Sequence, residues 1–199
     1  SNVTVMCIGT ASTGASDWYV ITGGGGSTLG TQDVWIPARA MDPRATNGAE
    51  DGGKKETSTN KVNYSTWDFD TTTQEFTQFM WQPPRNYNNG TVKFTPYWTA
   101  GSGSGGVVWA CQGVAISNDD PLDSAFGTEQ TSTDTFIVAN DVHVGPQSSA
   151  ITIAGTPADS DLIIFQVKRN PSDASDTLGV DAQLIGVMLE YTIDSGVTS

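Results

Sequence analysis

Short apolar or alternating segments, separated by turn-forming residues, recur along the whole of this chain. Such spacing is typical of antiparallel sandwiches and barrels, because strand–helix–strand units would place helical periodicity between the strands. Within residues 92–99, for example, Val92, Phe94 and Trp98 fall on one face of a strand while the residues between them fall on the other. The segments that we expect to form strands are 3–8, 18–21, 34–38, 62–70, 76–81, 92–99, 107–116, 133–138, 150–153, 162–169 and 183–193.

This pattern predicts an all-β fold, an antiparallel two-sheet sandwich of the jelly-roll type, with an immunoglobulin-like or lectin-like sandwich as the alternative. We expect a single sandwich domain over residues 1–199, which is long enough to bury a core without a metal or a disulfide. One short helical turn is expected at 120–127, because Asp120 can cap it, Pro121 suits its first position and Gly127 can end it.

Three polar segments are expected to be connections. Residues 42–60 are polar and charged and predict a long surface loop, either a solvated insertion or a segment that binds a partner. Residues 86–90 predict a turn, since an Asn-Gly pair adopts positive φ at low cost. The Gly/Ser tract 101–106 is interpreted as a hairpin loop and not as a boundary between domains.

The charge of the chain limits its partners. With a formal net charge of −13 it would repel the phosphate backbone of DNA or RNA, so no nucleic-acid partner is expected. No stretch approaches the ~20 apolar residues of a membrane-spanning helix, so no membrane partner is expected. No signal-peptide pattern opens the chain, and we therefore expect a complete mature domain.

The two cysteines, Cys7 and Cys111, both lie in apolar strand-like segments. Free cysteine behaves as a small apolar residue, which favours two buried thiols. A disulfide between them remains the alternative, because the sequence does not give the distance between the two residues.

The sequence predicts no catalytic residue, no cofactor and no metal site, and therefore no enzyme. Its single histidine, His143, lies between two valines, and no serine occupies a Gly-x-Ser-x-Gly motif. One histidine and two distant cysteines lack the paired spacing of a zinc site. Asp68 and Asp70 would share a face of a strand, but this spacing more often marks a strand end that enters a turn than a pair of glycosidase carboxylates.

Calcium remains an open alternative, because two groups of oxygen-bearing side chains are close in the sequence. Asp120 is already explained as a helix cap, and neither group has the spacing of an EF-hand loop. The two groups are Asn118, Asp119, Asp120 and Asp123, and Asp173 with Asp176.

The aromatic residues offer a further lead, since exposed tryptophan and tyrosine stack on sugar rings whereas buried ones fill a core. Nearly all of the tryptophans lie in the expected strands, which favours the core for most of them; they are Trp18, Trp35, Trp67, Trp81, Trp98 and Trp109. Tyr87, in its Asn-rich turn, is the best candidate for an exposed contact with a ligand or a subunit.

Several segments resemble a known family. They are residues 34–41, 67–70, 90–98, 113–120, 165–169 and 184–187. Together they resemble the jelly-roll virion proteins of tailed bacteriophages, which serve as capsid decorations, head fibres or tail-fibre domains. The resemblance covers about 34–193 and rests on strand segments, so no functional residue carries over from it.

The resemblance implies a structural virion protein, most readily a capsid decoration or head-surface protein that acts by protein–protein contact. A homotrimer, contacts with other capsid or tail proteins, and a place on the virion surface after assembly in the bacterial host cytoplasm are expected on the same ground. No heptad run or collagen-like repeat provides a fibre shaft. The alternative is a carbohydrate-binding, receptor-recognition domain of a tail fibre or spike, with a host-surface glycan as partner. That alternative predicts exposed tryptophan or tyrosine in a groove, whereas a glycosidase or lyase, the third hypothesis, predicts two carboxylates converging in a cleft.

Overall fold

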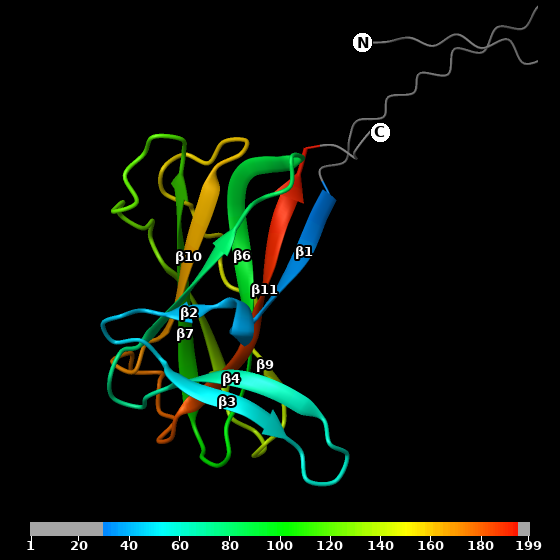
Figure 1. Ribbon diagram of the computed structural model, residues 1–199. Coiled ribbons are helices and arrows are strands. Elements are labelled where there is room, and N and C mark those ends of the chain that lie inside the picture. Colours follow the sequence, from blue (N-terminus) through cyan, green and yellow to red (C-terminus); the bar gives the residue numbers. More distant parts are fainter. Residues whose placement is uncertain (1–29, 195–199) are drawn as a thin grey trace, which may run out of the picture.

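The computed structural model describes residues 30–194, which form two antiparallel sheets packed face to face (Figure 1). This confirms the predicted all-β, jelly-roll-type sandwich. The elements are β1 (Gly30–Pro37), the 3-10 turn η1 (Ala38–Ala40), β2 (Asp42–Pro43), β3 (Glu50–Glu56), β4 (Asn63–Phe69), β5 (Phe76–Trp81), β6 (Tyr87–Thr99), β7 (Gly106–Ile116), β8 (Gln130–Thr135), β9 (His143–Val144), β10 (Leu162–Arg169) and β11 (Ala182–Ile193).

The two sheets differ in how they are built. The first has the order β3-β4-β11-β6-β9, and β1 also pairs with β11. Since β1 pairs with residues 186–193 of β11 and β4 with residues 182–184, these two strands follow one another along the same edge of β11. The second sheet has the order β2-β5-β10-β7-β8. In both sheets a late strand of the chain is central, so β11 and β10 join the earlier strands on either side of them.

The core between the sheets follows from the alternation in the sequence. Aromatic rings from the two sheets meet there: Phe69 packs edge-to-face on Trp109 at 5.1 Å between ring centroids. Trp67, Trp81, Trp98 and Trp109 are all buried, as expected. Trp18, the expected strands 3–8 and 18–21, and Cys7 lie outside the described residues.

The segment 42–60 is not the surface loop that the sequence predicts. It contains β2 and the edge strand β3, which pairs with β4 over 50–56. A bulge between Asp51 and Gly53, where Gly53 has φ 72°, interrupts this pairing. An edge strand with one solvent-exposed face tolerates charged residues. The composition of such a strand therefore resembles that of a loop.

The expected turn at 86–90 lies inside β6. Tyr87 pairs with Ile193 and Val92 with Tyr191, so the residues between them bulge out of the strand. Asn89 has φ 55°, so the Asn-Gly pair does adopt positive φ, but within a bulge. Residues 101–106 are not a hairpin loop either, because they connect β6 to β7, which belong to different sheets.

Residues 120–127 form no helix, and the one helical turn among residues 30–194 is η1. The Asp120 carboxylate accepts a hydrogen bond from the Ser117 amide at 3.1 Å, which closes a turn on the preceding residues. The Gly127 amide donates to the Gly113 carbonyl of β7 at 3.0 Å. This bond holds the segment in an irregular path along the sheet. In the expected strand 150–153, one isolated bridge forms, between Val92 and Ile151.

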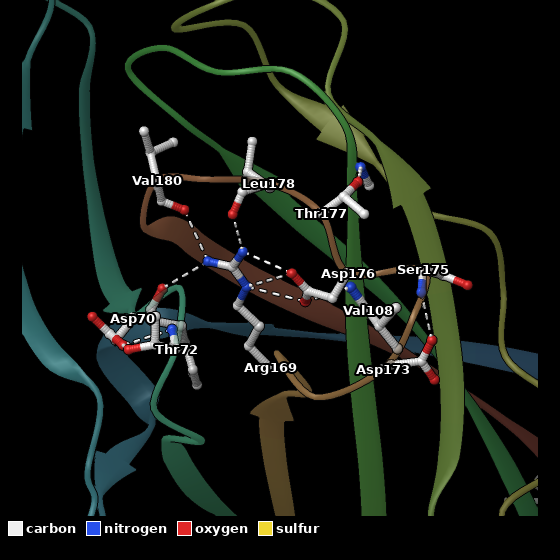
Figure 2. Close-up of polar contacts among 12 residues, drawn as sticks. Asp70, Thr72, Val108, Arg169, Asp173, Ser175, Asp176, Thr177, Leu178 and Val180 are labelled. Atoms are coloured by element: carbon white, nitrogen blue, oxygen red, sulfur yellow. Dashed lines mark hydrogen bonds and ion pairs between the residues drawn. The ribbon is translucent and has the colours of Figure 1, made fainter.

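A buried ion pair joins the two sheets at one end of the sandwich (Figure 2). Arg169, at the end of β10, pairs with Asp176 at 2.8 Å, and the two side chains are 0% and 1% exposed. The guanidinium also donates to the carbonyl of Phe69, at the end of β4, and to those of Leu178 and Val180. The carboxylate of Asp176 accepts in addition from the Val108 amide of β7. This pair therefore fixes the connection that leads from β10 into β11.

We predict that Asp176→Ala destabilises the fold by ~3–5 kcal/mol, because it leaves the buried guanidinium without its counter-charge. Urea unfolding followed by tryptophan fluorescence measures this loss. The control is Glu56→Ala, which removes an ion pair to Lys61 whose side chains are 65% and 50% exposed. That loss is expected to stay below ~1 kcal/mol. Equal losses in the two variants would contradict the structural role of the buried pair.

Candidate functional site

The outer face of the first sheet carries an exposed aromatic pair. Trp35 of β1 is 45% exposed, whereas the other tryptophans within residues 30–194 are buried. Its ring meets that of Tyr97 on β6 edge-to-face, with 5.0 Å between centroids and 82° between planes. Gly186 of β11 lies beneath, and a Cβ there would come within 2.6 Å of the indole. We call Trp35, Tyr97 and Gly186 the aromatic platform.

Strand parity explains why these rings face outward. In β1, Val34 and Ile36 pack against the core, so Trp35 between them faces the other way. Trp98 is fully buried, so Tyr97, the residue before it in β6, also points away from the core. The edge-to-face contact with Tyr97 and the close approach of Gly186 hold the indole, so little conformational entropy would be lost when a ligand covers it.

Polar groups lie along the same face. Lys93 of β6 forms an ion pair with Glu190 of β11 at 3.2 Å, and its amine also donates to the Gln147 side chain at 3.3 Å. Glu190 lies two residues beyond Met188, the register partner of Trp35. The apolar ring surface is thus accompanied by groups that can donate and accept hydrogen bonds.

A cavity of about 200 Å³ opens on the same face. Tyr64 of β4, Thr99 of β6 and Ile185 of β11 line it, together with Val62 and Val142. Thr99 is only 3% exposed, and its hydroxyl has no hydrogen-bond partner among the residues described. The cavity therefore combines apolar side chains with one unsatisfied polar group.

The carboxylate candidates Asp68 and Asp70 are engaged in local contacts. Asp68 accepts hydrogen bonds from Lys55 at 3.3 Å, Gln183 at 3.1 Å and Thr66 at 2.6 Å. Asp70 accepts from the amides and hydroxyl of the turn that follows it, and these bonds lower its pKa to about 2 (Figure 2). Asp70 therefore follows the last residue of β4 and starts a turn, as its spacing suggests. Neither Asp68 nor Asp70 lines the cavity beside the platform.

Two other acidic residues lie close to this turn. Burial raises the pKa of Glu75, and the nearby charges of Asp70 and Glu50 raise it further. Burial also raises the pKa of Asp181, again with a smaller contribution from neighbouring carboxylates. The sequence did not single out either residue, because they meet only through the pairing of distant strands. In residues 30–194 no group of three or more histidine, cysteine, aspartate or glutamate side chains could hold a metal ion.

The two calcium candidates are used to fix turns. Asp120 caps the Ser117 amide, and the Asn118 side chain donates to Asp119 at 2.7 Å. In the second group, Asp173 accepts from the Ser175 amide at 2.8 Å, while Asp176 is the partner of Arg169 in Figure 2. Asp119, Asp120, Asp173 and Asp176 thus each accept a hydrogen bond within or beside their own turn.

The structure places the remaining candidates in the core. His143 is 5% exposed and stacks between Trp98 at 4.5 Å and Phe136 at 5.3 Å. Its Nε2 accepts a hydrogen bond from the Ile137 amide at 3.0 Å. Cys111 is a fully buried, free thiol, and burial raises its pKa.

The interpretation of Tyr87 as an exposed contact is wrong. Its side chain is 2% exposed, its ring packs edge-to-face on Trp81 at 5.2 Å, and its hydroxyl donates to the Gly90 carbonyl. Burial raises the pKa of Tyr87 to about 12. The exposed aromatic that the sequence reasoning missed is Trp35, and the apolar residues on either side of it were the available signal.

No protein-family model matches the sequence, and no characterised protein matches it in sequence. The described chain contains no helix long and apolar enough to cross a membrane.

Solved structures with a similar arrangement of strands include three carbohydrate-binding modules. One is the family 11 module of Clostridium thermocellum in complex with a β-1,3-1,4-mixed-linked tetrasaccharide, with 11% identity, a TM-score of 0.44, and coverage of 82% of this chain and 96% of the module. A family 28 module specific for non-crystalline cellulose has 13% identity, a TM-score of 0.40 and coverage of 79% and 88%. The module TmCBM61 in complex with β-1,4-galactotriose has 13% identity, a TM-score of 0.34 and coverage of 82% and 90%. A likeness this low assigns no ligand to the present chain.

Proposed function

We propose that this protein is a non-catalytic glycan-binding domain, and that the aromatic platform is its binding surface. The observation that carries the proposal is the half-exposed indole of Trp35, held on a sheet face by Tyr97 at 5.0 Å. An aromatic ring offers a flat apolar surface, and a pyranose ring presents a similar surface of C–H groups. Stacking of the two buries apolar area without displacing the sugar hydroxyls from water.

The surroundings of the platform suit a sugar. Lys93 and Glu190 form an ion pair on the same face, and such groups can hydrogen bond to the hydroxyls at the rim of a stacked ring. The formal net charge of −13 favours neutral glycans over anionic ones, which the field of the protein would repel.

Catalysis is not part of the proposal. A glycosidase needs two carboxylates on opposite sides of the scissile bond. Glu190 is neutralised by Lys93, and Asp70 is held by the backbone of its own turn. The raised pKa values of Glu75 and Asp181 follow mainly from burial, and neither side chain lines the cavity beside the platform.

We predict that Trp35→Ala lowers the affinity for any glycan found on an array by at least about tenfold, because central aromatic anchors carry much of a binding energy. Isothermal titration calorimetry with the array hit measures the change. The matched control is Met80→Ala, which removes a side chain that is 69% exposed on a strand of the other sheet. An array without any bound glycan, or equal affinities for the wild type and Trp35→Ala, would contradict the proposal.

A structural virion protein, as the family resemblance implies, is the second candidate. The observation that favours it is a patch of exposed apolar side chains around β9, formed by Ile137, Val138, Val142 and Val144. Exposed apolar patches are typical of surfaces that contact other proteins. A homotrimer joined through this patch would meet the expectation from the resemblance.

For this candidate we predict that light scattering after gel filtration gives the mass of three chains, and that Ile137→Asp reduces it to that of one. The introduced charge would be buried without a partner in the interface. A monomeric wild type would contradict the trimer.

A further inference from the structure

The cavity beside the aromatic platform is built from segments that are distant in the sequence. Val62 and Tyr64 come from the β3–β4 hairpin and Val142 from the loop before β9, while Thr99 and Ile185 belong to the central strands. Val62 and Val142 are 58% and 63% exposed. Two apolar side chains that are exposed to water thus line the same cavity of about 200 Å³, and a ligand there would cover them.

Thr99 is the one buried polar residue of this cavity, whereas Thr57 and Asn140, which also line it, are exposed. The adjacent Trp98 points into the core, so Thr99 points to the outer face, where it lines the cavity. Its hydroxyl is buried and has no partner among the described residues. A buried hydroxyl without a partner is unfavourable, and a ligand that supplies an acceptor removes this cost. A change of χ1 to another staggered rotamer would exchange the hydroxyl with the methyl group.

We infer that this cavity is a subsite for the acetamido group of an N-acetylated sugar. The inference rests on the proposed glycan-binding function and names its substrate class. The acetamido methyl would pack against Val62, Val142 and Ile185, and its carbonyl oxygen would accept a hydrogen bond from Thr99. Asn140, whose exposed side chain also lines the cavity, provides a donor and an acceptor for the amide.

The position of the cavity relative to the platform fits one sugar chain across both. Tyr97 and Thr99 are two residues apart on the same face of β6, which is about 7 Å at the rise of an extended strand. A pyranose stacked on the platform can therefore place a substituent, or the next residue of the chain, at the cavity. Gly186 and Ile185 of β11 continue this path.

The chemistry of the lining selects an acetamido group over the alternatives. A free hydroxyl or hydroxymethyl would bring a hydrated oxygen against the valines, whereas the acetamido group brings a methyl there. A carboxylate would meet no cation, since none of the residues that line the cavity is charged, and the net charge of −13 opposes it. A group with one acceptor, one donor and one methyl fits the lining.

The test compares two trisaccharides that share the β-1,4 linkage and differ in the substituent at C2. One is built of N-acetylglucosamine and the other of glucose. Isothermal titration calorimetry of the full chain should give an affinity for the acetylated trisaccharide that is about five- to tenfold higher, the size expected of one additional hydrogen bond with its apolar contact.

Thr99→Val keeps the shape of the side chain and removes only the unpartnered hydroxyl, so the thermal midpoint of unfolding should not fall. It should abolish the preference for the acetylated trisaccharide, so that the two affinities become equal. Thr99→Ser should retain the preference. Thr133→Val, the same substitution at an exposed position of β8, is the control and should change neither affinity.

The outcomes separate the two proposals. Equal wild-type affinities for the two trisaccharides, both lost in Trp35→Ala, would overturn the acetamido subsite and support the platform. A preference that survives in Thr99→Val would also overturn the subsite. Affinities that Trp35→Ala leaves unchanged would overturn the platform, and failure of both trisaccharides to bind would overturn the subsite.

Discussion

The buried pair of Arg169 and Asp176 is the interaction on which the rest of the structure depends. Its guanidinium reaches carbonyls at the end of β4 and in the connection before β11, and its carboxylate partner reaches β7. Two charges in a core are costly unless every donor and acceptor is satisfied, so this network allows few arrangements of the connection. The connection leads into β11, in which Gly186 pairs with Tyr97 of β6 and lies beneath the indole of Trp35.

Much of the sandwich could be predicted because alternation and burial are local properties. The bounds expected for β5 and β10 agree with the structure, and β7 is buried on both faces. Segment 42–60 could not be predicted in this way, because a charged edge strand and a solvated loop have the same composition. The segment that begins at Asp120 has a plausible helix-capping pattern. A helical turn of so few residues is only weakly stabilised, and the Gly127 amide instead donates its hydrogen bond to β7.

The site was less predictable than the fold. The core was expected for most of the tryptophans and Trp35 was not singled out, although Val34 and Ile36 on either side of it indicate that it faces away from the core. Tyr87 was expected to be exposed from its polar neighbours, whereas a bulge turns its ring into the core. The cavity around Thr99 depends on the pairing of β4, β6 and β11 and on a loop before β9. These segments are distant in the sequence, so no pattern within a short stretch of it predicts their contacts.

The proposed function requires that a sugar covers Trp35 on the outer face of the first sheet. Heteronuclear NMR of the wild-type protein during titration with an array-identified glycan tests it directly. We expect shifts of the Trp35 indole N–H and of the Tyr97 and Gly186 amides, while the indole signals of Trp98 and Trp109 stay in place because both rings are buried. Shifts confined to the other sheet, or to the apolar patch around β9, would contradict it.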